Sequence, residues 1–78
     1  MRLLKTLERI KRIDALIQRK ATGTPKELAE KLGISESSLY NNISLMKSMG
    51  AAIYYCPFKM SYCYQEHQQF VFGFVQKD

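Results

Sequence analysis

The stretch that decides the fold is residues 24–46, which read TPKELAEKLGISESSLYNNISLM. Its first half carries three independent signals for the beginning of a helix. Thr24 can cap the helix, Pro25 suits the first helical position, and Glu27 stands three residues after the cap, as in a capping box. These signals predict a short helix over residues 25–32.

The second half of the stretch predicts a longer helix. Ser35 is the expected N-cap and Gly50 the expected stop, so the helix should cover residues 36–49. Three apolar residues recur at intervals of four and three and should form its buried stripe: Leu39, Ile43 and Met46.

The junction between these two helices has helix-turn-helix spacing. Ala29 is small enough to let the helices pack closely, and Gly33, four residues later, permits a sharp turn. Ile34 and Leu39 are placed to fill the angle between the helices. Each feature alone is weak, but together they predict a helix-turn-helix unit.

Upstream of this unit, residues 2–20 are expected to form one helix, with Gly23 supplying the backbone conformation that stops it. Its apolar residues recur at helical spacing: Leu3, Leu7, Ile10, Ile13 and Ile17. The opposite face is a basic stripe of Arg2, Lys5, Arg9, Arg12 and Arg19. Such a stripe is more often a solvated surface than a ligand site.

Downstream of Gly50 the sequence period changes from 3.6 to 2. Aromatic and β-branched residues predict strands over 52–56, 61–64 and 70–75, and residues 57–60 form the loop of the first hairpin. The expected fold is therefore mainly α with a small β-sheet (α+β). Residues 1–78 should form a single domain, because this length allows no second one.

Composition excludes several function classes. The chain lacks an uninterrupted apolar run long enough for a signal sequence or a membrane span, which favours a cytoplasmic location. It has one His, no carboxylate pair beside it and no glycine-rich phosphate loop, so an enzyme is not expected. Cys56, Cys63 and His67 do not match the spacing of a zinc site, so neither a metal nor a cofactor is expected.

The positive charge is concentrated in one segment. The chain carries 12 Lys+Arg against 7 Asp+Glu, a net charge of +5. Residues 1–20 hold seven basic and two acidic residues, and residues 21–50 and 51–78 are each balanced. Attraction to a polyanion would therefore act through the first helix and the overall field.

Over roughly residues 3–64 the sequence resembles the winged helix-turn-helix domain of bacterial transcription regulators, of the biotin-repressor-like and DeoR-like type. The resemblance is carried by Pro25–Ala29, Leu32–Ser35 and Leu39–Tyr40, and continues through Ile43, Met46, Gly50 and Ile53 to Tyr62 and Tyr64. It implies that helix 36–49 enters the major groove of double-stranded DNA and that the 52–64 hairpin is a wing.

Transferred position by position, the resemblance implies a set of DNA contacts: Thr24, Lys26, Ser37, Ser38, Tyr40, Asn41, Asn42, Lys47 and Lys59. Helix geometry agrees for the residues of helix 36–49, which project away from its apolar stripe. Their chemistry agrees as well, since Asn pairs with adenine edges and hydroxyl groups hold phosphates. The alternative for these polar residues is an ordinary solvated helix face.

A second function stays open because the sequence departs from the family pattern. The family commonly has Arg at the position of Asn41, and the wing tip here carries Pro57, Phe58 and Met60 in place of basic residues or glycine. Alternation also predicts that Tyr54, Cys56 and Cys63 point outward, which suggests that strand 70–75 or a second copy covers this face. The alternative is thus a protein-interaction or dimerisation module, and a homodimer is expected.

Overall fold

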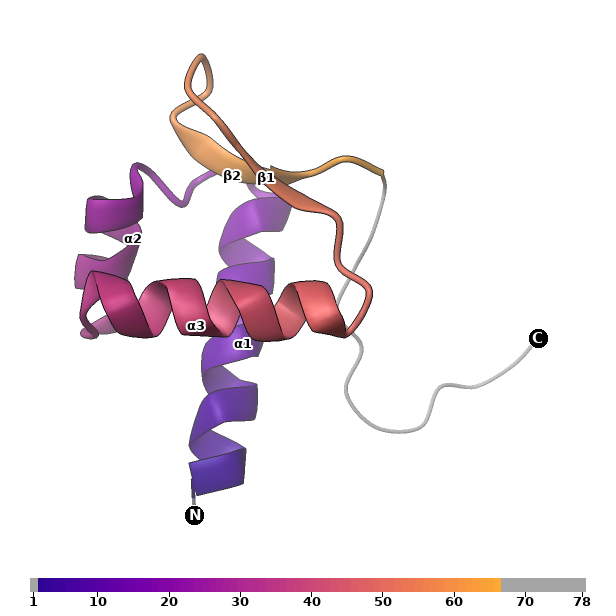
Figure 1. Cartoon of the computed structure of the whole chain (residues 1–78). Helices are drawn as coiled ribbons and strands as arrows, with labels where there is room; N and C mark the ends of the chain where they lie inside the picture. The colour runs from indigo at the N-terminus through magenta and orange to yellow at the C-terminus, as the bar shows by residue number, and fades with distance from the viewer. Residues whose placement is uncertain (1, 67–78) are drawn as a thin grey trace.

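The computed structural model describes residues 2–66 (Figure 1), with side chains from Lys5 onward. Three helices precede an antiparallel hairpin: α1 (Arg2–Gln18), α2 (Pro25–Leu32), α3 (Glu36–Ser48), β1 (Ile53–Cys56) and β2 (Ser61–Tyr64). This confirms the predicted fold class of three helices followed by a hairpin. The predicted strand 70–75 lies outside the described residues, so a single domain over 1–78 remains a prediction.

The three helices end on the same backbone motif. The residue two positions beyond α1 and the glycines after α2 and α3 have positive φ: Lys20 at 52°, Gly33 at 69° and Gly50 at 105°. In each case the next N–H donates back to a carbonyl inside the helix, at 2.9 to 3.0 Å. This is the Schellman arrangement, which satisfies carbonyls that a helix end leaves free.

The stop of α1 corrects the sequence analysis, which assigned it to Gly23. Lys20 occupies the left-handed position instead, and the N–H of Ala21 donates to the carbonyl of Leu16 at 2.9 Å. Gly23 serves the start of α2, because a Cβ atom there would lie 3.0 Å from the Cβ of Glu27. The glycine thus leaves room for the cap of the next helix.

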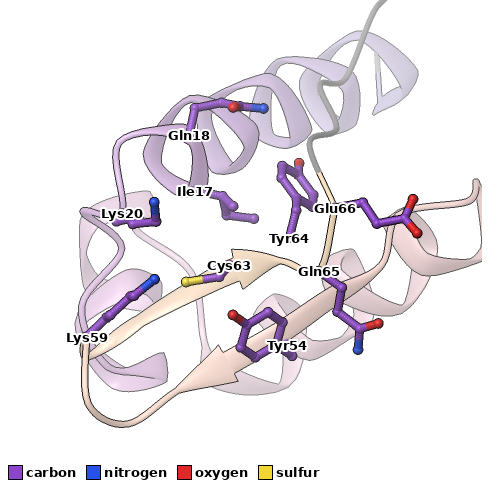
Figure 2. A pocket seen from close by; sticks show the side chains of 9 residues that line it. All are labelled: Ile17, Gln18, Lys20, Tyr54, Lys59, Cys63, Tyr64, Gln65 and Glu66. Atoms are coloured by element: carbon purple, nitrogen blue, oxygen red, sulfur yellow. The ribbon is translucent and has the colours of Figure 1, made fainter.

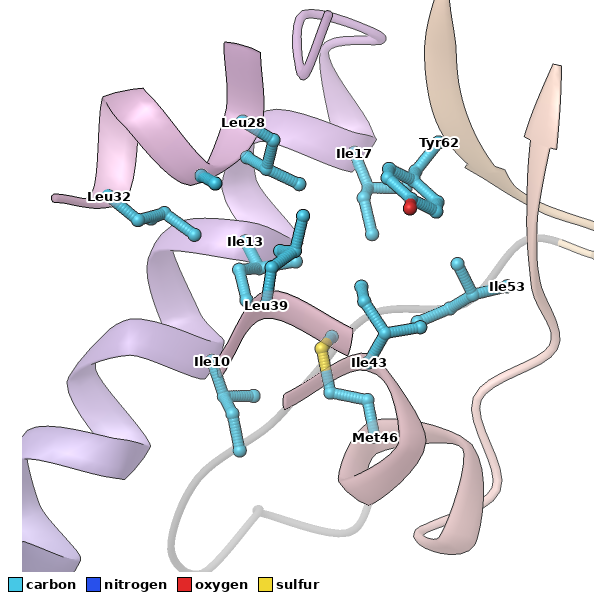
Figure 3. Close-up of a cluster of buried hydrophobic side chains, with 11 residues drawn as sticks. Ile10, Ile13, Ile17, Leu28, Leu32, Leu39, Ile43, Met46, Ile53 and Tyr62 are labelled. Atoms are coloured by element: carbon cyan, nitrogen blue, oxygen red, sulfur yellow. The ribbon is translucent and has the colours of Figure 1, made fainter. Parts of the chain in front are cut away.

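One hydrophobic core joins all three helices to the hairpin (Figure 3). At its centre Ile10 and Ile13 of α1, Leu28 of α2 and Leu39 of α3 are fully buried. The predicted stripe residues of α3 are all in this core, and Ile53 and Tyr62 close it from the hairpin side. Burial of this shared core supplies most of the driving force that holds the three helices and the hairpin together.

The hairpin presents an aromatic face to the core, with Tyr62 buried in it and Tyr55 and Tyr64 packed against it. Tyr55 pairs with Tyr62 in the register of the sheet, and their rings meet edge to face with centroids 5.3 Å apart. Cys63 pairs with Tyr54 on the outer face, as the alternation predicts, and it is covered there, with a side chain that is only 3% exposed. The connection from α1 to α2 runs along the outer edge of β2 and covers this strand. The neighbouring strand β1 has no such cover at Tyr54, whose side chain is exposed.

A buried polar cluster fastens that connection to β2. The hydroxyl of Thr22 accepts a hydrogen bond from the N–H of Tyr62 at 2.8 Å and lies 3.1 Å from the hydroxyl of Ser61. The Ser61 hydroxyl in turn accepts from the N–H of Thr22 at 3.3 Å. Thr22 and Ser61 are both fully buried, so water cannot replace these bonds.

A second polar contact ties the end of β2 to α1. The hydroxyl of Tyr64 donates to Oδ1 of Asp14 at 2.6 Å, and the Gln18 side-chain amide donates to the same oxygen at 3.2 Å. Burial, and then the bond to Asp14, raise the pKa of Tyr64 well above its ordinary value of 10.0. The hairpin is therefore held to α1 at this point by a hydrogen bond from the tyrosine hydroxyl to the Asp14 side chain.

The Thr22–Ser61 cluster makes a testable prediction for stability. Replacing Thr22 with Val removes the hydroxyl at nearly constant shape and leaves the N–H of Tyr62 unsatisfied, which should cost about 1–3 kcal/mol of unfolding free energy. Ser61→Ala should cost a similar amount, and the double variant less than the sum, with a coupling of at least about 0.5 kcal/mol. Urea unfolding of the four proteins measures this, and strictly additive losses would contradict the cluster.

The Tyr64–Asp14 contact predicts a pH dependence. The folded state raises the pKa of Tyr64, so the contact stabilises the fold fully below pH 10 and is lost as the pH rises above it. Tyr64→Phe should therefore lower the unfolding free energy at pH 7 by about 1–2 kcal/mol, and the difference from the unmodified chain should shrink above pH 10. Thermal unfolding across pH 7–11 tests this. Coincident curves would show that the hydroxyl contributes nothing, and separated curves that stay parallel above pH 10 would contradict the raised pKa of Tyr64.

Candidate nucleic-acid interface

The exposed side of α3 carries a row of small polar side chains. Ser37, Asn41, Ser44 and Ser48 follow one another at intervals of four, three and four residues, so they share one face of the helix. All four are exposed, and they lie opposite the stripe that enters the core. We call this set the α3 polar row. Ser44 and Ser48 were missed from the sequence, although their spacing from Ser37 and Asn41 places them on this face.

Asn42 does not share that surface, contrary to its predicted position. Its side chain is 8% exposed and its Nδ2 donates to the carbonyl of Ser38 at 2.7 Å. It lies beside the buried stripe, on the flank of α3 that faces Thr6 and Arg9 of α1. The packing of α1 against this flank removes the amide from the exposed face, and its hydrogen bond returns to the helix backbone.

Ser38 contributes to the beginning of α3. Its N–H donates to the hydroxyl of the N-cap Ser35 at 3.1 Å, and the two hydroxyls are 3.2 Å apart. The side chain is half-buried, because it also lines the recess between α3 and α1. The cap fixes where α3 starts, and thereby which residues join the α3 polar row.

Tyr40 and Lys47 lie on the other flank of α3, toward the hairpin. Both are exposed and stand seven residues apart, which places them on the same side of the helix. Tyr62 of β2 has a raised pKa, chiefly because it is buried, and Tyr40 and Glu36 on this flank raise it further. The negative charge of Glu36 offsets the positive charge of Lys47, so α3 itself is close to neutral.

The N-terminus of α2 is capped by side chains of its own first turn. The hydroxyl of Thr24 accepts from the N–H of Glu27 at 3.2 Å, and the Glu27 carboxylate accepts from the N–H of Thr24 at 2.9 Å. This is the predicted capping box, and the bond from the Thr24 N–H lowers the pKa of Glu27. Because Pro25 has no N–H, a phosphate at this helix end would depend on exposed Lys26.

The family model described as HTH domain matches residues 6–57. The chain belongs to this helix-turn-helix family. The match covers two thirds of the chain and runs from α1 through β1, so it includes the α2–turn–α3 unit on which the polar row is built. No curated protein and no solved structure matches the chain significantly. The fold is that of a DNA-binding helix-turn-helix domain with a hairpin that fits a winged helix.

The tip of the hairpin in this helix-turn-helix domain exposes large apolar side chains. Phe58 is 98% exposed and Met60, with a φ of 50°, is also exposed. Lys59, the predicted wing contact, lies between them and is exposed too. The tip therefore presents one cation flanked by two large apolar side chains.

Lys59 also borders a recess that sequence reasoning did not find. It lies between the end of α1 and the hairpin, and Figure 2 shows Lys20 and Lys59 beside Cys63. Tyr64 and Glu66 close the other end of the recess. Lys20 is the left-handed residue of the turn that ends α1, and this turn places its side chain near Lys59 of the hairpin.

Two further properties of residues 2–66 concern membrane spans and metal ligands. No helix in this range is long and apolar enough to cross a membrane. Cys56 and Cys63 are free thiols, and the described side chains contain no cluster of three metal-ligating residues. His67, which the sequence places near these cysteines, lies outside the described residues.

Proposed function

We propose that this helix-turn-helix domain is a transcription regulator, or the DNA-binding part of one. In this proposal α3 reads the major groove of double-stranded DNA and the hairpin contacts the backbone as a wing. The observation that carries the proposal is the α3 polar row, an exposed face of hydrogen-bonding side chains on the second helix of the helix-turn-helix unit. Nothing in this mode of action requires catalysis, a metal or a cofactor, and it suits a cytoplasmic protein.

Asn41 is the residue of the polar row best suited to base recognition. Its amide offers a donor and an acceptor side by side, which matches N6 and N7 of adenine in the major groove. The serines around it are short, so the helix backbone can approach the groove closely while their hydroxyls reach bases or phosphates. Asn41 is fully available for this, since it is exposed in the folded chain.

Tyr40, Lys47 and Lys59 would make the contacts that position the domain. On the hairpin flank, the Tyr40 hydroxyl and the Lys47 ammonium are both suited to phosphate oxygens. Lys59 is exposed at the wing tip, where its ammonium would meet the backbone in the same way. Ser37 at the beginning of α3, and Thr24 and Lys26 at the beginning of α2, complete the proposed interface. There the Lys26 ammonium is the group left for phosphate, because the Thr24 hydroxyl is engaged in the cap.

Selection of bound duplexes from a random DNA pool tests this function. The unmodified chain should enrich a sequence, and its affinity should fall steeply between two salt concentrations because phosphate contacts release counterions. Asn41→Ala should weaken binding to the enriched duplex by about 1–3 kcal/mol, since a base contact is lost. Binding of the same variant to a random-sequence duplex should not change, and neither should its thermal unfolding. Failure to bind any pooled duplex at low salt would refute the function.

The apolar wing tip favours a second candidate, a protein-interaction or dimerisation module. Phe58 is almost fully exposed, and Met60 and Tyr54 on the same hairpin are exposed as well. Large apolar side chains grouped in this way are typical of an interface between chains. In this candidate two copies would meet through their wings, and the predicted strand 70–75 would add to the contact.

Sedimentation velocity over a range of protein concentrations tests the wing contact. The unmodified chain should shift from monomer to dimer as concentration rises, and Phe58→Ser should remain monomeric because it removes the most exposed apolar side chain of the interface. Asn41→Ala is the matched control on another surface and should dimerise normally. A chain that stays monomeric at the highest concentration would rule out dimerisation through the wing and leave the DNA-binding function in place.

A further inference from the structure

We propose that α1 takes part in DNA binding through Arg9, which would hold a backbone phosphate in the recess between α1 and α3. This inference rests on the proposed DNA-binding function and names an additional contact within it. The recess is lined from α1 by Thr6 and Arg9, and from α3 by Ser38, Asn41, Asn42 and Leu45. It therefore opens directly beside Asn41, the member of the polar row proposed to read a base.

Arg9 differs from the other basic residues in its setting. Among the basic side chains described between Lys5 and Glu66 it is the one that is partly buried, and the others are exposed. Partial burial against α3 limits the conformations of a long side chain, so less entropy is lost when it binds a ligand. The guanidinium group has a planar set of donors that matches two oxygens of a phosphate.

The other groups in the recess are also suited to a phosphate. Thr6 and Ser38 carry hydroxyls that can donate to a phosphate oxygen, while the Asn41 amide at the edge of the recess is the group proposed to read a base. The Asn42 amide is already committed to the carbonyl of Ser38. Among the described residues that line this recess there is no carboxylate, so none of them places a negative charge beside an anion.

The arrangement of the elements places this recess at one edge of the proposed groove contact. In Figure 1 the hairpin lies on one side of α3, and the N-terminal half of α1 extends on the other. The major groove is about 12 Å wide, so a helix inside it has a phosphate backbone along each side. The wing would then meet one strand, and Arg9 the other.

A phosphate contact by Arg9 would also explain why the positive charge is concentrated on α1. The whole net charge of +5 is carried by residues 1–20, whereas residues 21–50, which include α2 and α3, are balanced. Lys5, one turn before Arg9, lies next to it on α1 and is exposed. A phosphate contact from α1 brings this charge into the interface and compensates for the neutral recognition helix.

Three variants of the full chain test the proposal by fluorescence anisotropy with a labelled random-sequence duplex and with the enriched duplex. Arg9→Gln should weaken binding to both by a similar factor, and the slope of log affinity against log salt should become shallower by about 1. Arg9→Lys keeps the charge and should retain most of the slope. Lys11→Gln removes the same charge from the opposite flank of α1, outside the recess, and should change the slope far less.

The outcomes separate this proposal from the function on which it rests. If Arg9→Gln and Lys11→Gln lower affinity equally, the effect is one of net charge and the phosphate site is refuted, while DNA binding stands. Loss of affinity for the enriched duplex alone would make Arg9 a base contact and would also overturn the phosphate site. If the unmodified chain binds no duplex, both proposals fail. Thermal unfolding of the three variants confirms that each is folded.

Discussion

The rest of the structure depends on the contact between Thr22 and Ser61. These two buried hydroxyls, 39 residues apart in the sequence, join the α1–α2 connection to β2. The connection leads directly into α2, and β2 is one strand of the hairpin. The contact therefore sets the position of the hairpin relative to the helix-turn-helix unit. Hydrophobic burial holds the three helices together but is not directional. The directional restraint comes from this cluster and from the Tyr64–Asp14 bond at the far end of β2.

Recognition and attraction are divided between different elements in the proposed mechanism. The α3 polar row is nearly uncharged and supplies hydrogen bonds of limited reach, which suit discrimination among bases. The positive charge is carried on α1, where Arg9 is the cation held closest to that row. Such a division would make non-specific affinity depend on α1 and sequence preference depend on α3.

Local signals in the sequence were sufficient to predict the helices and their beginnings. The Thr24–Glu27 capping box and the Ser35 cap involve residues three apart, and both occur in the structure as predicted. The stop of α1 was predicted wrongly because a glycine is the usual left-handed residue, and here a lysine adopts that conformation three residues earlier. Gly23 is left-handed as well, with a φ of 74°, but it lies beyond the helix end, and a sequence pattern does not reveal which of the two residues ends the helix.

Contacts between distant segments could not be predicted in the same way. Nothing in the local pattern of Thr22 or Ser61 indicates that they meet, and Asn42 was assigned to the exposed face because the position of α1 was unknown. The cover on the outer face of β2 was expected from strand 70–75 or a second copy, and the α1–α2 connection beside β2 was missed because that contact is also non-local. Of the predicted DNA contacts on α3, the structure leaves Ser37, Tyr40, Asn41 and Lys47 exposed, and their contact with DNA remains a prediction.

The most direct test of this mechanism is to map the DNA-binding surface by NMR, following the backbone amide signals of the labelled chain as an enriched duplex is added. The mechanism predicts that the largest changes fall on Ser37, Asn41 and Ser44, with further changes at Arg9 and at Lys59. Amides on the opposite flank of α1, at Lys11, should change little. Changes confined to the wing tip, with none along α3, would contradict the claim that α3 reads DNA.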